Sequence, residues 1–161
     1  MGRNQAEETT NAMRILNSAG IEYTTASYSW DEEHLDAVHA AQAAGFPVEQ
    51  LYKTIVMKAA SNRLYVFCVP APFEISLKKA REITGEKAID LLKLTELQKN
   101  TGYIRGGCSP LGMIRQYPTY IEELAQLYPT IYVSAGRRGL LLGLSPTDLA
   151  RLCRADFVSF T

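Results

Sequence analysis

Two glycine-rich turns in the last third of the chain carry residue types suited to binding an anion or a polarised carbonyl group. The first lies in 101-TGYIRGGCSPLG-112, and the second lies in 134-SAGRRG-139. Glycine lets a backbone take positive φ or approach a ligand closely, and successive N–H groups in such turns can hold an anion. Arg105, Arg137 and Arg138 lie in or beside these turns. The same pattern is typical of an ordinary β-hairpin, so a pocket wall and a plain turn both remain open.

Lys53 is a second candidate for chemistry, because it lies in the otherwise apolar stretch 51-LYKTIVM-57. On a strand, its side chain shares a face with Ile55 and Met57. A lysine among apolar neighbours either lies at a sheet edge and reaches water or points into a pocket where its charge has a partner. Spacing alone favours the sheet edge.

The remaining reactive side chains form no recognisable catalytic or metal-binding set. Cys108 lies in the first glycine loop, where nearby cations can activate a thiol, but its candidate bases, His34 and His39, lie in a distant acidic segment. These histidines are five residues apart in an expected helix over 31–45, so they should point to different faces and make a poor metal pair. Trp30 is expected in the core. The chain has no phosphate-loop, GxGxxG or GxSxG motif, and we expect neither a metal nor a cofactor.

Composition predicts one globular domain spanning residues 1–161. The chain is 47% hydrophobic and 21% charged, which suits a single core. Its apolar runs are far shorter than the roughly 20 residues that span a membrane, and the polar start MGRNQAEETT is unlike a secretory signal. Three separated cysteines without a CxxC pair indicate reduced thiols. We therefore expect a cytoplasmic protein that does not bind membranes.

The net charge of the chain is zero, but it is unevenly distributed. Residues 1–50 carry a balance of −6, residues 51–100 one of +4, and residues 101–154 one of +3. Cations that cluster in the same stretch as the glycine turns can present a local phosphate-binding face. A solvated surface explains them equally well, and a neutral chain is not a general nucleic-acid binder.

The order of the apolar patterns predicts an α/β (α+β) fold with a mixed sheet. Hairpins over 51–70 and 130–144 exclude an all-parallel sheet. Residues 117–128 fit either a strand or a helix. Helices are expected at 6–18, 31–45, 76–83, 93–100 and after the N-cap Ser145, and strands at 21–28, 51–60, 64–70, 130–133, 139–144 and 156–160.

Several blocks of the sequence, in order, resemble the YbaK/EbsC family. Its members are free-standing relatives of the editing domain of bacterial prolyl-tRNA synthetases. The resemblance covers about residues 10–160, and blocks that match in order are more specific than any single motif. The matching blocks are 52-YKT-54, 101-TGYIRGG-107, 109-SPLG-112, 131-IYVS-134, Gly136 and Arg138-Gly139.

The resemblance implies a compact domain with a mixed, barrel-like sheet flanked by helices. It implies release of a misattached amino acid, cysteine first and alanine next, from the 3′ end of tRNA(Pro) or tRNA(Cys). A water, the terminal ribose hydroxyl or the substrate's own thiol acts as nucleophile, so no metal or catalytic triad is required. The partners implied are aminoacylated tRNA and, for a docked editing subunit, prolyl-tRNA synthetase.

The resemblance also implies roles for particular residues. Lys53 matches the family's essential lysine, near the terminal phosphate and the ester, and a fixed cation suits that position. Backbone N–H groups of the glycine turns suit an ester oxygen that gains charge. Tyr28, Thr54, Gly106, Gly107, Ser134 and Gly136 are expected to form the substrate pocket, and Arg137 and Arg138 to contact tRNA.

Two positions depart from the family pattern. Leu141 stands where relatives often carry an acidic residue near the pocket, which leaves the specificity for cysteine open. Cys108 stands where relatives often carry an apolar residue, which argues against a nucleophilic role. The alternative function is a non-catalytic regulatory protein, or one that binds tRNA or a synthetase, with the same fold.

Overall fold

The computed structural model describes residues 9–161. The polar segment 1–8, including the start of the helix expected at residue 6, lies outside the described residues. The helices are α1 (Asn11–Ala19), α2 (Ala37–Ala44), α3 (Leu77–Thr84), α4 (Leu94–Thr101) and α5 (Pro146–Cys153), with short 3₁₀ helices η2 (Val48–Gln50) and η3 (Glu123–Leu127). The strands are β1 (Thr24–Ser27), β2 (Tyr52–Ala59), β3 (Leu64–Pro70), β4 (Ile89–Leu91), β5 (Thr119–Glu122), β6 (Ile131–Ser134), β7 (Leu140–Leu144) and β8 (Asp156–Val158).

The strands form two sheets that meet at the start of β2. One has the order β1-β7-β6, and the other has the order β4-β2-β3-β5-β8. A parallel bridge between Leu51 and Tyr132 joins them. The expected mixed sheet is confirmed, because β3–β5 and β5–β8 are parallel whereas the other strand pairs are antiparallel. Within residues 9–161 the sheets do not close into a barrel.

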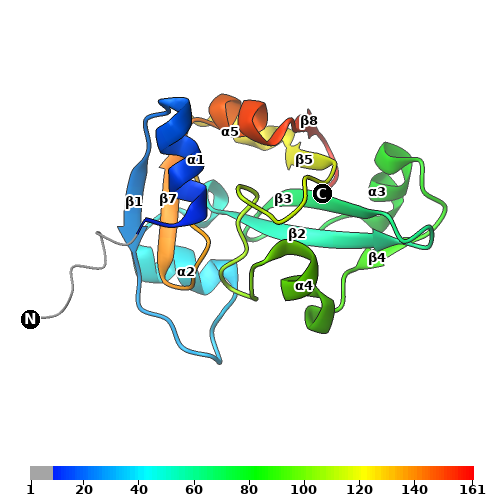
Figure 1. Cartoon of the computed structure of the whole chain (residues 1–161), viewed down its shortest axis with the longest axis horizontal. Helices are drawn as coiled ribbons and strands as arrows, with labels where there is room; N and C mark the ends of the chain where they lie inside the picture. The colour runs from blue at the N-terminus through cyan, green and yellow to red at the C-terminus, as the bar shows by residue number, and fades with distance from the viewer. Residues whose placement is uncertain (1–8) are drawn as a thin grey trace, which may run out of the picture.

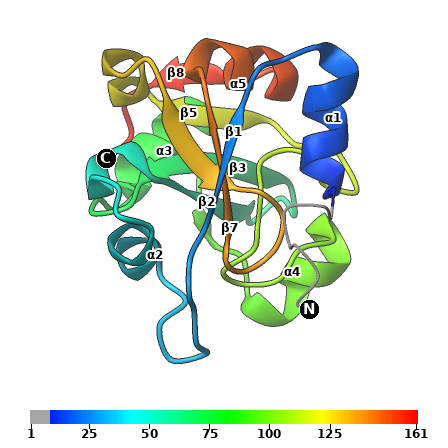
Figure 2. The same cartoon turned by 90° about the vertical axis from the view of Figure 1, so that its left-hand side faces the viewer.

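The long β2–β3 hairpin links the two ends of the molecule (Figure 1). Near one end of it lie β1, β7 and α1, and near the other lie β4 and α3. Seen from the first end, β1 and β7 pass in front, α5 lies above, and α2 and α4 lie below on opposite sides (Figure 2). The hairpin therefore supports both sheets.

Apolar faces of the two sheets account for the main core clusters. The first cluster packs α1 and α5 against β6 and β7, with Leu16, Leu142 and Leu149 fully buried. The second lies where α3 and the chain end cover β2 and β3, and there Phe67 meets Phe160 edge to face at 5.0 Å. Burying each such side chain stabilises the fold by about 1.5–3 kcal/mol.

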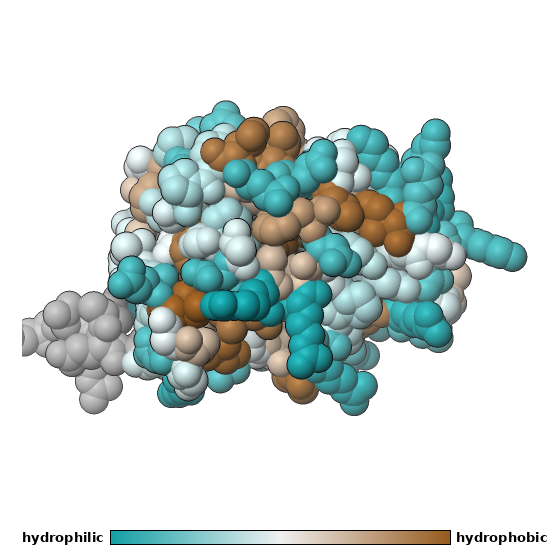
Figure 3. Space-filling view, turned by 90° about the horizontal axis from the view of Figure 1, so that it is seen from above, coloured by the Kyte–Doolittle hydropathy of each residue, from teal (hydrophilic) through white to brown (hydrophobic). Residues whose placement is uncertain are grey.

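The outer surface above α5 has no broad apolar face. In Figure 3 the hydrophobic groups on this side are small and separated by hydrophilic side chains. Within residues 9–161, none of the helices combines the length and apolarity needed to cross a bilayer.

Several local predictions need correction. The helix expected at 31–45 begins at Ala37, because the Asp36 side chain accepts from the His39 N–H and caps it there. Trp30 was expected in the core but is 45% exposed. Ser145 precedes α5 as expected, yet its side chain makes no capping hydrogen bond. Strand β4 was not predicted, and the ambiguous stretch forms β5 followed by η3.

Candidate active site

One edge of strand β2 is unpaired between its pairing with β4 and its bridge to β6. The N–H of Ala71 donates to the Leu51 carbonyl, and the N–H of Ala59 donates to the Arg63 carbonyl. Odd-numbered residues of β2 therefore direct their main-chain groups toward β3, and even-numbered residues toward the opposite edge, because these groups alternate along a strand.

On that opposite edge, Val56 accepts from the N–H of Leu92, at the register where β4 leaves off. The bridge to β6 lies at Leu51. Thr54 falls between these two contacts, and within residues 9–161 no strand pairs with it on this edge. The N–H and C=O of Thr54 therefore face a gap in the sheet.

A cavity of about 480 Å³ lies along this gap. The whole stretch 51–56 lines it, together with Leu92 beyond β4, Leu97 of α4, and Ser134 and Leu141 of the other sheet. A volume of this size is typical of small-ligand sites. It suits an aminoacyl group with its terminal sugar, not a whole nucleic acid.

Lys53 lies on the cavity wall with its charge partly shielded from water. Its side chain is 22% exposed, and its ammonium donates to the Ala71 carbonyl at 3.2 Å and approaches the Glu74 carboxylate at 3.5 Å. Glu74 is 91% exposed, so this ion pair is weak and easily displaced. Lys53 is paired with β3 rather than lying free at a sheet edge, and its cation is available to an anionic ligand.

Four more of the expected substrate residues also line the cavity. They are Tyr28, Thr54, Gly106 and Ser134. Burial raises the pKa of Tyr28, and a backbone hydrogen bond with Gly139 offsets part of that rise, so the phenol stays neutral at pH 7. The Thr54 hydroxyl is buried without a hydrogen-bond partner among the described residues, which is uncommon in folded proteins.

The other expected residues lie outside the cavity lining. Gly107 packs directly on the turn after β6: a Cβ there would lie 3.0 Å from both the Arg137 Cα and the Arg138 N. Gly136, at φ +103°, lies against the ring of Tyr103. These two glycines and the two arginines are not among the residues that line the cavity. The two glycine-rich turns therefore pack against each other, and Gly106 is the glycine at the cavity.

Cys108 lines the cavity, but its thiol is a poor nucleophile. Burial raises its pKa from 9.0 to about 12, and a hydrogen bond with the Thr101 side chain offsets this rise in part. The thiol is therefore almost entirely protonated at neutral pH, whereas the thiolate is the reactive species.

The histidines differ from the sequence prediction. His34 precedes α2 instead of lying within it, and its ring centroid is 4.6 Å from that of His39. Asp31 accepts from His34, and Asp36 pairs with His39. Within residues 9–161 no group of three or more metal-binding side chains comes together.

Sequence reasoning missed three polar residues on the cavity wall. Asp36, Glu74 and Arg105 all line the cavity. Arg105 was noted beside a glycine turn without a role. Asp36 lies within the helix expected over 31–45 and was given no role, and Glu74 was not singled out.

Known proteins are similar to this chain over most of its length. The model of the family described as "Aminoacyl-tRNA editing domain" matches residues 31–152. A relative in Enterococcus faecalis, described as "Putative Cys-tRNA(Pro)/Cys-tRNA(Cys) deacylase EbsC", is 37% identical over 161 residues, covering 100% of this chain and 98% of that protein. The chain belongs to the aminoacyl-tRNA editing domain family, and its activity is that of an aminoacyl-tRNA deacylase.

Solved structures share the same fold. A crystal structure described as that of "a putative trans-editing enzyme for prolyl tRNA synthetase" superposes with a TM-score of 0.78 at 24% identity, covering 93% of this chain and 92% of that one. The structure of hypothetical protein APE2540 gives a TM-score of 0.82 at 18% identity, covering 92% and 99%. The predicted α/β editing-domain fold is thereby confirmed.

Proposed function

We propose that this chain acts in trans, in the cytoplasm, to remove cysteine, and alanine next, from tRNA(Pro) or tRNA(Cys). The observation that carries the proposal is the combination of a lysine ammonium and an unpaired strand edge in one small cavity. The relative with full-length similarity is described with the same two tRNA substrates.

In this proposal Lys53 binds the phosphate of the tRNA 3′ end. Its present partners are a neutral carbonyl and an exposed carboxylate. A phosphate oxygen can replace Glu74 at little cost, since exposed ion pairs contribute about 0–1 kcal/mol. The ester then lies beside β2.

The N–H of Thr54 is our candidate donor to the ester carbonyl oxygen. It faces the gap in the sheet and belongs to a strand that β3 holds rigidly along its other edge. A fixed donor of this kind stabilises the negative charge that grows on the oxygen during attack. The donor needs no side chain.

The nucleophile comes from outside the protein. A water oxygen adds to the ester carbon, the bond from that carbon to the ribose oxygen breaks, and a proton from the water passes to the ribose oxygen, which becomes a hydroxyl. With cysteine, the substrate's sulfur adds instead, its proton passes to the ribose oxygen, and the amino acid leaves as a thiolactone. Positioning and charge stabilisation then supply the rate.

The test is release of amino acid from Cys-, Ala- and Ser-charged tRNA(Pro) and tRNA(Cys). We expect wild type to release cysteine fastest and Lys53→Ala to lose about 10²–10³-fold in rate. Lys58→Ala is the matched control, because Lys58 lies on the same strand but away from the cavity and pairs with Glu96. No release from any substrate, even with prolyl-tRNA synthetase present, would overturn the proposal in favour of a non-catalytic binding protein.

Docking on prolyl-tRNA synthetase is a separate proposal. The chain has a net charge of zero, whereas autonomous tRNA binding usually rests on several phosphate contacts. A synthetase that holds the tRNA would supply the missing affinity. Co-precipitation of the two purified proteins with tRNA(Pro) tests this, and its absence leaves the deacylase proposal intact.

A further inference from the structure

Trp30, the single tryptophan of the chain, forms an exposed aromatic surface two residues beyond Tyr28, which lines the cavity. It follows β1, and 45% of it is exposed. The guanidinium carbon of Arg138 lies 5.3 Å from the centre of its ring. This pair presents flat aromatic and guanidinium surfaces next to each other.

Both side chains are held in place. Gly139 leaves room for the indole, because a Cβ there would lie 2.8 Å from the ring carbon Cδ1 of Trp30. The N–H of Tyr28 donates to the Gly139 carbonyl at 2.9 Å, which ties the start of the loop to the same turn. Arg138 Nε donates to the Arg105 carbonyl at 2.8 Å. The surface is therefore preorganised, which lowers the entropic cost of binding.

The pair lies next to the proposed site. Tyr28, two residues before Trp30, lines the cavity, and so does Arg105, whose carbonyl holds Arg138. A ligand that extends out of the cavity on the side of Tyr28 and Arg105 would therefore meet this surface.

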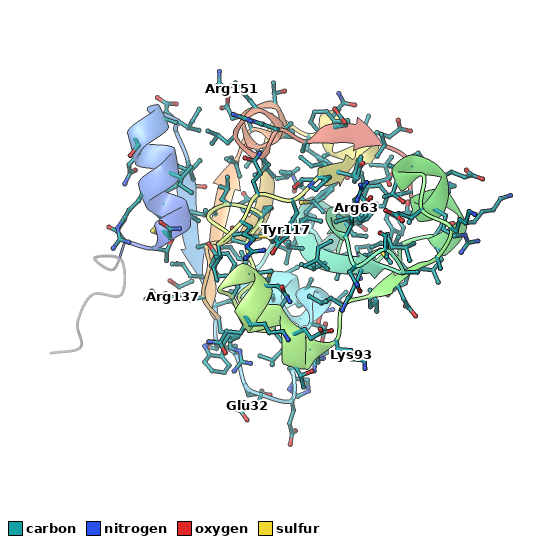
Figure 4. All side chains as sticks on the ribbon, turned by 45° about the vertical axis from the view of Figure 1, so that its right-hand side comes forward. Glu32, Arg63, Lys93, Tyr117, Arg137 and Arg151 are labelled. Atoms are coloured by element: carbon teal, nitrogen blue, oxygen red, sulfur yellow. The ribbon has the colours of Figure 1, made fainter. Side chains whose placement is uncertain are left out.

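Charge near the pair disfavours a phosphate as its ligand. Trp30 is followed directly by Asp31, Glu32 and Glu33, all exposed. Figure 4 shows Glu32 on this loop at the lower end of the molecule, with Arg151 at the opposite end. A neutral ring avoids repulsion by these carboxylates. Nucleobases stack on aromatic rings and on guanidinium planes, with little dependence on base identity.

We propose that Trp30 and Arg138 form a stacking site for the nucleobase of the 3′-terminal nucleotide of the substrate tRNA. The inference rests on the proposed function and adds to it the recognition of a base outside the cavity. Trp30 binds the ring, and Arg138 positions Trp30 and extends the stacking surface.

The experiment uses uncharged CCA trinucleotide and the same trinucleotide without its terminal base. Because Trp30 is the one tryptophan, its fluorescence reports binding directly. We expect CCA to quench it and the abasic form to bind at least fivefold more weakly. With a fluorescently labelled trinucleotide, Trp30→Leu should weaken binding roughly 5- to 150-fold, and Trp30→Phe should restore most of it.

Two further variants separate stacking from charge. Arg138→Lys keeps the cation but loses the planar group, so it should weaken CCA binding, whereas Arg115→Lys, at an exposed position outside the cavity wall, should not.

In deacylation, Trp30→Leu should raise KM and leave kcat nearly unchanged. Equal binding of CCA and the abasic form, or unchanged binding by a folded Trp30→Leu, overturns the inference even if wild type deacylates. Base-dependent binding without deacylation instead supports this site and overturns the proposed function alone.

Discussion

The Lys53 ammonium and the Ala71 carbonyl are 3.2 Å apart, across the end of the β2–β3 hairpin. This hydrogen bond fixes the position of the cation without neutralising it, since the carbonyl carries no net charge. The neighbouring Glu74 carboxylate is almost fully exposed. The proposed catalytic cation is therefore oriented by the main chain, and the exposed carboxylate competes with the substrate for it.

Glu74→Gln should tighten substrate binding. The substitution removes the anion that competes for Lys53, so KM for aminoacyl-tRNA should fall about two- to fivefold, the range of an exposed ion pair, with kcat little changed. Glu82→Gln, on the exposed surface of α3, is the control and should leave KM as it is. A rise in KM for Glu74→Gln would show that Glu74 supports the cation instead.

Gly107→Ala should impair catalysis more than it impairs stability. The new Cβ would meet the backbone of Arg137 and Arg138 at 3.0 Å and push the two turns apart. A contact at this distance requires a shift of a few tenths of an ångström, so we expect a loss in rate smaller than the roughly 10²-fold that a displacement of about 1 Å can cost. Gly85→Ala is the comparison. Alanine is unfavourable there because of the positive φ of Gly85, but a Cβ at that position would meet no atom within 4 Å. If both variants lose the same activity at equal folded fraction, the packing of the two turns does not matter for catalysis.

Leu141→Ala should widen amino-acid selection. Leu141 is 2% exposed, lines the cavity and is paired with Ser134. Truncation enlarges the pocket, so larger aliphatic aminoacyl groups should gain in kcat/KM relative to alanine, while stability falls by about 2–5 kcal/mol. Competition between differently charged tRNAs measures the first effect and denaturant unfolding the second. An unchanged order of substrates would place the selecting wall elsewhere.

Cys108→Ala should retain deacylation. The raised pKa of Cys108 leaves its thiol protonated at neutral pH, so the side chain fills space without attacking the ester. Single-turnover rates with Cys- and Ala-tRNA provide the measurement. Loss of activity together with a covalent acyl adduct on wild-type Cys108 would contradict this.

Alkaline pH should destabilise the fold. The pKa values of Cys108 and Cys153 are raised by burial from 9.0 to about 12. The folded state thus holds these protons more tightly than the unfolded state, and the stability they contribute is present below pH 9 and lost between pH 9 and 12. Urea midpoints at pH 7.5 and pH 10 should differ, and the difference should shrink in Cys153→Ala. Equal midpoints would show that ionisation of these thiols is not linked to unfolding.

Much of the fold could be predicted because it follows from local patterns. The hairpins over 51–70 and 130–144 alternate around short polar turns, and glycines end four of the helices in left-handed conformation. Strand β4 was not predicted, because it has three residues and is held by its pairing with Met57, Lys58 and Ala59. Helix α2 begins at Ala37 instead of at Asp31, because the Asp36 side chain caps its first turn.

The candidate site was less predictable than the fold. Lys53 was predicted as a site residue, but its spacing favoured a sheet edge. The gap beside Thr54 exists because the bridge to β6 lies at Leu51, whereas the pairing with β4 begins at Met57. No local pattern encodes that divergence. Trp30 was expected in the core because it follows a predicted strand, whereas its observed position depends on Gly139, more than one hundred residues away along the chain.

The proposed hydrogen-bond donor, the main-chain N–H of Thr54, is present whichever side chain occupies position 54, with proline the exception. Point substitutions can therefore remodel the walls of the pocket, at Leu141 or Ser134, without removing that donor. A scaffold of this kind is readily retargeted: directed evolution on the walls should reach new aminoacyl specificities faster than in a site whose polarising group is itself a side chain.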